Sequence, residues 1–123
     1  MRARSLLLVM TLLTAIAPAA ADPRCFTVTQ MSGWRSPDAK TIYFRIGTDR
    51  YYRLDLARQC TTLKSINPHL LLTNRQGGTI CSVLDLDVKA GESPGGITEP
   101  CFPKALTELS ASEAAALPKD EKP

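Results

Sequence analysis

Residues 41–56 combine two alternating segments with a short connection, and this pattern constrains the fold more than any other part of the chain. In residues 41–46 and again in 51–56, apolar side chains occupy every second position, which is typical of a strand with one buried face. Only three residues that suit a turn, Gly47-Thr48-Asp49, stand between Ile46 and Arg50. The sequence therefore predicts an antiparallel hairpin with an apolar inner face and a polar outer face.

Two registers of this hairpin keep both apolar faces together. In the first register, Arg45 lies opposite Arg53, where like charges are destabilising. In the second, Arg45 lies opposite Tyr51 and Tyr43 lies opposite Arg53. Each outer pair can then form a cation–π contact of about 0.5–1 kcal/mol. The second register also makes a three-residue loop whose last residue, Asp49, takes the left-handed conformation. We predict the second register.

The first 21 residues have the features of a secretory signal peptide. Arg2 and Arg4 precede an apolar run over residues 6–16, and Ala19-Ala20-Ala21 supplies small residues at a cleavage site. The apolar run is too short for a membrane span. We therefore expect cleavage before Asp22, a periplasmic or secreted protein, and no membrane span after signal cleavage.

The remaining 102 residues are enough for one small domain. We expect a single β-rich domain over residues 22–118 and a frayed tail over 119–123. The formal charge of +3 falls to +1 once Arg2 and Arg4 are removed. Near neutrality in an exported protein argues against a nucleic-acid partner.

All four cysteines follow the signal segment, at Cys25, Cys60, Cys81 and Cys101. An even number of cysteines in an exported chain predicts two disulfides, for which three pairings are open. The spacing contains no C-x-x-C pair, so it indicates neither a thioredoxin-like motif nor a zinc site. We prefer Cys25–Cys101 with Cys60–Cys81, because the first bridge would join the two ends of the fold.

Further strands are expected where apolar runs recur, in segments 26–28, 70–73 and 80–88, with an edge strand at best around Cys101. In the 80–88 segment, Leu84, Leu86 and Val88 would share one face. Turn residues separate these runs at 36–38, 74–78 and 91–96.

A short helix is expected near the end of the chain. Ser110 and Glu113 have capping-box spacing, and Pro118 ends the helical run over 111–117. A helix this short must dock on the sheet, through Leu109 and Leu117. A second helical piece is expected within 57–63. The predicted fold is mainly β: a small antiparallel sheet or barrel of about five or six strands with a short C-terminal helix, stapled by disulfides.

Several stretches together resemble a known group of proteins. They are the cysteine at 25, GWRSPDAKTIYFRI from Gly33, YYRLDLARQC from Tyr51, Cys81 followed by Asp85, and Cys101 ahead of a short helix. The chain is similar to a family of short, exported, four-cysteine bacterial proteins catalogued only as a domain of unknown function. The resemblance implies export, four cysteines and a mostly β domain, and it assigns no catalytic residue, ligand or partner.

Residues with catalytic potential are few. His69 is the only histidine and has no nucleophile motif beside it. Asp85 and Asp87 would share a strand face, where solvation is their ordinary role, and two carboxylates supply too few ligands for calcium. We therefore expect no catalytic residue, no metal and no cofactor.

The basic part of the chain suggests a recognition surface, because residues 35–64 carry a formal charge of +4 and residues 65–123 carry −3. Tyr43, Arg45, Tyr51 and Arg53 fall on the outer face of the hairpin, and we call this set the Tyr/Arg face. Arginine and tyrosine suit carboxylate, phosphate or sugar ligands, although an ordinary solvated face is the alternative. Trp34 either covers the edge of the core or anchors a partner.

The leading interpretation is a non-catalytic binding or interaction module of the bacterial cell envelope, with an anionic or sugar ligand on the Tyr/Arg face. One alternative is a small envelope hydrolase that uses Asp85, Asp87 or His69. Another is a structural or stress-related envelope protein without a small ligand. A flat, open Tyr/Arg face favours binding, whereas a cleft that holds His69 beside a carboxylate favours the enzyme.

Overall fold

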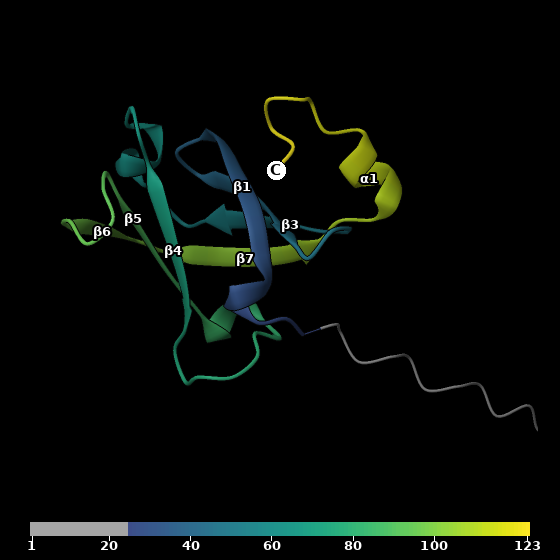
Figure 1. Cartoon of the computed structure of the whole chain (residues 1–123), viewed down its shortest axis with the longest axis horizontal. Helices are drawn as coiled ribbons and strands as arrows, with labels where there is room; N and C mark the ends of the chain where they lie inside the picture. Colours follow the sequence, from purple (N-terminus) through teal and green to yellow (C-terminus); the bar gives the residue numbers. More distant parts are fainter. Residues whose placement is uncertain (1–24) are drawn as a thin grey trace, which may run out of the picture.

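The predicted hairpin lies in the middle of a four-stranded antiparallel sheet in the computed structural model, which describes residues 25–123 (Figure 1). Its strands are β2 (Thr41–Ile46) and β3 (Arg50–Leu56). Strand β1 (Met31–Asp38) pairs with β2, and β7 (Pro103–Glu108) pairs with β3. The signal-peptide prediction falls on residues outside the described part of the chain.

The register of the hairpin confirms the prediction, because Tyr43 lies opposite Arg53 and Arg45 opposite Tyr51. The conformation predicted for Asp49 is wrong. Gly47 takes the left-handed conformation instead, with φ of 64°, and no non-glycine residue of the described chain has a positive φ. Glycine adopts this conformation without the steric penalty that a Cβ atom brings.

A second, three-stranded antiparallel sheet packs against the first. It has the order β4 (His69–Asn74), β5 (Leu86–Gly91), β6 (Thr98–Cys101). The inner faces of both sheets contribute to one core of buried apolar side chains. From β6 the chain passes through a single residue, Phe102, into β7, so the two sheets are joined almost without a loop (Figure 1). The expected mainly β, disulfide-linked fold is thus confirmed, with seven strands in two sheets within residues 25–123 where about five or six were expected.

The structure also contains short 3-10 turns. Two of them, η1 (Val28–Gln30) and η3 (Val83–Asp85), replace parts of expected strands, and η2 (Thr61–Lys64) overlaps the end of the segment 57–63 in which a second helical piece is expected. The prediction of one strand over 80–88 is therefore wrong: Ser82 caps η3, and Leu84 is 82% exposed instead of sharing a buried face with Leu86. The expected turn over 36–38 is wrong as well, because these residues belong to β1, where the register shifts.

The disulfides are Cys25–Cys81 and Cys60–Cys101, so the preferred pairing is wrong. The neighbouring backbone explains the observed pairs. The Phe26 N–H donates to the Ile80 carbonyl at 3.0 Å, which brings position 25 beside position 81. The Ala57 N–H donates to the Phe102 carbonyl at 2.8 Å, which brings the chain after β3 beside the end of β6.

The chain then leaves β7 and forms helix α1 (Ala111–Ala115), which ends two residues before the predicted end. The predicted capping box is present, with Ser110 and Glu113 bonded reciprocally. Beyond α1 the chain turns back, and its last described residues lie beside β1 (Figure 1). There a Cβ atom placed on Gly33 would lie 3.7 Å from the backbone of Pro123. The expected fraying of 119–123 stays a prediction.

Candidate functional site

Strand β2 is buried on both faces, and this sets it apart from the other strands. Ile42 and Phe44 point into the core, but Thr41 and Tyr43, on the outer face, are buried too. Tyr43 is only 8% exposed, so the expectation of an exposed Tyr/Arg face is wrong at this residue. Part of the outer face of the four-stranded sheet is therefore covered, and it is not the flat, open surface that the sequence suggested.

A groove of about 530 Å³ lies between this outer face and the helix that follows β7. Its volume is within the range of small-molecule sites, about 300–1,000 Å³. We call it the helix groove. It is lined by Tyr43, Arg53, Asp55, Thr107, Leu109, Glu113, Ala116 and Leu117.

Tyr43 supplies an accessible hydroxyl in this groove. Its hydroxyl has no hydrogen-bond partner within residues 25–123, and it is not among the fully buried polar atoms that lack one. The hydroxyl oxygen is therefore not completely buried, although the residue as a whole is. A tyrosine in this position offers one donor and one acceptor to a bound molecule.

Arg53 and Asp55 form an ion pair along the same face of β3. The Arg53 Nε and Nη2 atoms both lie 3.0 Å from Oδ1 of Asp55. This hydrogen bond, with the charge of Asp55, raises the pKa of the Arg53 guanidinium above its usual value. The Asp55 carboxylate therefore balances the Arg53 charge, while one of its oxygens remains available as an acceptor.

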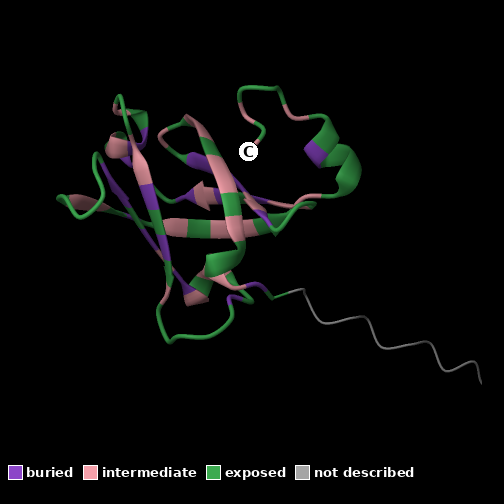
Figure 2. Cartoon of the chain, in the orientation of Figure 1, coloured by how far each residue is buried: buried purple, intermediate pink, exposed green. Residues whose placement is uncertain are grey.

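Helix α1 forms the opposite wall. The Ser110 N–H donates to Glu113 Oε1 at 3.1 Å, and the Glu113 N–H donates to Ser110 Oγ at 3.2 Å. The first of these bonds lowers the pKa of the Glu113 carboxyl. Ala114 is the buried residue of the helix, at 4% exposure, and Figure 2 shows α1 as otherwise exposed. The predicted docking residues Leu109 and Leu117 both line the groove and are half-buried.

The cross-strand cation–π pairs expected on the Tyr/Arg face are wrong. The remaining two residues of this face, Arg45 and Tyr51, make different contacts. Arg45 Nε donates to Ser32 Oγ at 2.9 Å. Tyr51 is approached by the ammonium of Lys122, at 5.8 Å from the ring centroid. Neither Arg45 nor Tyr51 lines the helix groove, so the structure divides the four predicted residues into two pairs.

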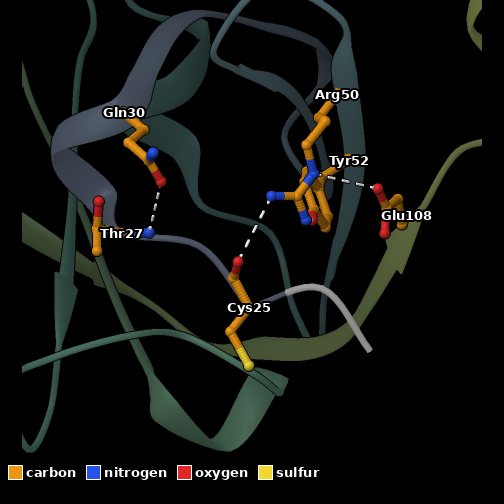
Figure 3. Close-up of polar contacts among 6 residues, drawn as sticks. All are labelled: Cys25, Thr27, Gln30, Arg50, Tyr52 and Glu108. Atoms are coloured by element: carbon orange, nitrogen blue, oxygen red, sulfur yellow. Dashed lines mark hydrogen bonds and ion pairs between the residues drawn. The ribbon is translucent and has the colours of Figure 1, made fainter. Parts of the chain in front are cut away.

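A polar junction closes the turn end of the hairpin (Figure 3). Arg50, which lies opposite Ile46, bonds to Glu108 of β7 at 3.3 Å and to the Cys25 carbonyl at 3.5 Å. It also donates to the Tyr52 hydroxyl and lies over the Tyr52 ring. These contacts tie the start of the described chain to both β3 and β7, which is a structural role.

Trp34 lies apart from the other predicted site residues. It pairs with Phe44, so it is on the inner side of β1, and it packs against the core. This agrees with the first of its two expected roles, covering the edge of the core. Its exposed part lines a second pocket of about 330 Å³ with Leu63 and Pro68. Trp34 and Tyr43 therefore cannot contact the same small ligand in one pocket.

The three residues named for a hydrolase are not brought together. Asp85 accepts from the backbone N–H groups of Cys81 and Ser82, at 2.9 and 3.1 Å, and so stabilises η3. Asp87 lies opposite Thr73, whereas His69 lies opposite Gly91. Four residues of strand separate the two positions, roughly 13 Å. Residues 25–123 also contain no cluster of three metal-ligating side chains.

A family model describes the whole chain. A family of unknown function, DUF6491, matches residues 1–123. The chain belongs to this family. The expected resemblance to an uncharacterised family is thereby confirmed, and DUF6491 assigns no activity or ligand to its members. No curated protein and no solved structure matches the chain. In the described part of this DUF6491 protein, no helix is long and apolar enough to span a membrane.

Of the groove residues, the sequence identified only Tyr43 and Arg53 as candidate site residues. It missed the other six in that role: Asp55, Thr107, Leu109, Glu113, Ala116 and Leu117. The alternation that marked the hairpin is absent from the segment around β7, where Pro103 interrupts the pattern. One signal for the groove was present in the sequence. Tyr43 places a large aromatic ring on the otherwise polar face of the hairpin, and burying such a ring stabilises a small domain.

Proposed function

We propose that the protein is a non-catalytic binding module of the bacterial cell envelope, and that its ligand, an anion or a sugar, occupies the helix groove. The observation that carries the proposal is Tyr43: the residue is only 8% exposed and lines a groove of ligand size, while its hydroxyl has no hydrogen-bond partner within residues 25–123 and is not fully buried. Arg53, Asp55 and Thr107 add polar atoms around it. Apolar walls with a few polar groups are typical of small-molecule sites.

A binding experiment with a blocked groove tests this proposal. Residues 22–123, with both disulfides formed, are immobilised and incubated with envelope extract, and the captured glycans and small molecules are identified by mass spectrometry. Thr107→Trp fills the groove from an exposed position of β7, and Thr73→Trp places the same side chain on an exposed position of β4. We expect capture by the unaltered chain and by Thr73→Trp, and loss of capture in Thr107→Trp.

Equal capture by Thr107→Trp, or no capture by the unaltered chain, would contradict the proposal. Thermal unfolding of both tryptophan variants provides the folding control. A lost ligand counts only if Thr107→Trp unfolds within a few degrees of Thr73→Trp.

The cellular location is part of the same proposal. It is supported by the basic and apolar features of residues 1–21 and by two disulfides, which persist in oxidising compartments. N-terminal sequencing of the protein from the envelope fraction checks it. We expect the mature chain to begin at Asp22, and a start at Met1 would contradict export with cleavage.

A further inference from the structure

The charges of the helix groove favour one of the two ligand classes, anion or sugar, that the sequence left open. Its lining contains one cation, Arg53, and two carboxylates, Asp55 and Glu113. Asp55 already balances Arg53 at 3.0 Å. An anion that entered the groove would therefore meet an arginine whose charge is compensated and a further carboxylate, and like charges at close range are repulsive.

The polar atoms that remain are neutral or are acceptors. The Tyr43 hydroxyl has no partner in the described chain, and Thr107 presents a second hydroxyl from an exposed position of β7. Asp55 adds a carboxylate oxygen that Arg53 does not use. Sugar hydroxyls donate and accept at the same time, so they can satisfy hydroxyl and carboxylate partners together.

The apolar part of the lining comes from the end of β7 and from the segment after α1. Leu109 directly follows β7, and its N–H donates to the Tyr51 carbonyl at 2.8 Å, whereas Ala116 and Leu117 follow α1. A pyranose ring has C–H groups on its faces and hydroxyls around its rim. Its faces can therefore contact these apolar side chains while its hydroxyls meet Tyr43, Asp55 and Thr107.

The cations suited to an anion lie elsewhere. Arg45 and Lys122 flank Tyr51, outside the groove lining. Within residues 25–123 neither of them forms an ion pair. An anionic ligand would thus be drawn to the Tyr51 side of the face, away from Tyr43.

We propose that the helix groove binds an uncharged, hydroxyl-rich ring, a neutral sugar, and discriminates against its acidic counterpart. This inference rests on the proposed function and narrows its ligand class. It assigns hydrogen bonding to Tyr43, Asp55 and Thr107, and apolar contact to Leu109 and Leu117.

The test uses two probes that differ at one carbon atom, methyl β-glucoside and methyl β-glucuronide. Each is titrated into the ¹⁵N-labelled chain of residues 22–123, and the shifts of amide signals are followed by NMR. We expect the glucoside to shift the amides of Thr107 and Glu113, with an affinity at least about fivefold greater than that of the glucuronide. Its affinity should not change between 20 and 300 mM salt, because no net charge is transferred into the groove.

Two variants assign the effect to the groove. Tyr43→Phe removes only the hydroxyl and should weaken glucoside binding about three- to tenfold. Asp55→Asn should narrow the preference for the glucoside over the glucuronide, because it leaves the charge of Arg53 without its carboxylate partner. Thr73→Trp, on the other sheet, is the control and should bind like the unaltered chain.

The remaining outcomes would contradict the inference. Equal or tighter binding of the glucuronide overturns the neutral-sugar inference, as do shifts confined to the surroundings of Arg45 and Tyr51. Absence of binding by both probes also overturns it. The proposed function then still stands if Thr107→Trp abolishes capture from envelope extract, and it fails with the inference if that variant changes nothing.

Discussion

The two sheets of this protein share one core but differ in what lies on their outer faces. On the four-stranded sheet, the segment that contains α1 covers part of that face, and β2 is buried on both sides. On the three-stranded sheet, β4 alternates between buried and accessible positions, and the outward-facing Leu71 is 48% exposed. The difference shows that the covering segment, and not the sheet alone, creates the groove.

The link between the two sheets is expected to have the largest effect on stability. The Cys60–Cys101 bridge joins the chain that follows β3 to the end of β6, and both sulfurs are buried. Replacing both cysteines by alanine should lower the free energy of unfolding by about 4 kcal/mol, from the entropy of the opened loop. Urea denaturation without reductant measures this. A loss below about 1 kcal/mol would mean that the sheets hold together without the bridge.

Truncation on the two outer faces tests the comparison directly. Tyr43→Ala removes a covered ring from the four-stranded sheet and should cost about 3 kcal/mol. Leu71→Ala removes a side chain that is already half in water and should cost less than about 0.5 kcal/mol. Both are measured by urea denaturation, and similar losses for the two variants would contradict the difference in covering.

The cap of α1 offers a milder way to loosen the cover. Ser110→Ala removes the oxygen that accepts from the Glu113 N–H, and should destabilise the helix by about 1 kcal/mol. Hydrogen exchange should then become faster at residues 111–117, with little change in β4. Faster exchange throughout both sheets would show that the cover does not open as a separate unit.

The smallest expected effect is the pH dependence of stability that arises from Glu99, on β6, and its hydrogen bonds to Thr62 of η2. Hydrogen bonds from the Thr62 side chain and backbone N–H lower the pKa of Glu99, on β6, below its usual 4.5. The ionised form is favoured in the folded state. Its contribution to stability is therefore complete above the unfolded-state pKa and is lost as the pH falls through the lowered folded-state pKa.

Glu99→Gln is the variant that isolates this contribution. The unfolding free energies of the unaltered chain and of the variant should differ most near pH 7 and converge towards pH 3. A difference that stays constant across this range would assign the effect to packing instead of ionisation.

The sequence was most informative where partners are close along the chain. The hairpin register followed from placing Arg45 away from Arg53, and the three-residue loop left little freedom for another pairing. The capping box at Ser110 and Glu113 was equally readable, because it depends on residues three positions apart. Both are local patterns, and their contributions to stability can be judged without knowing the rest of the fold.

Long-range features were not readable in this way. The disulfide pairing depends on where Phe26 meets Ile80 and where β6 meets the chain after β3, and neither meeting has a signature in sequence spacing. The alternation over 80–88 was misleading, since the Ser82 cap turns Leu84 to solvent. The groove depends on α1 lying near Tyr43, and the two segments that line it are about seventy residues apart.

The connectivity of the bridges has a consequence for how the chain matures. In chain order the cysteines are 25, 60, 81 and 101, and no two consecutive ones are paired in the structure. A chain that enters an oxidising compartment with its N-terminus first presents Cys25 and Cys60 together before either partner has arrived. If oxidation acts at once, it joins the wrong pair, and thiol–disulfide exchange must then exchange that bond. Under the export proposed above, efficient maturation is therefore expected to depend on a disulfide isomerase, or on oxidation that waits until Cys101 has entered the compartment.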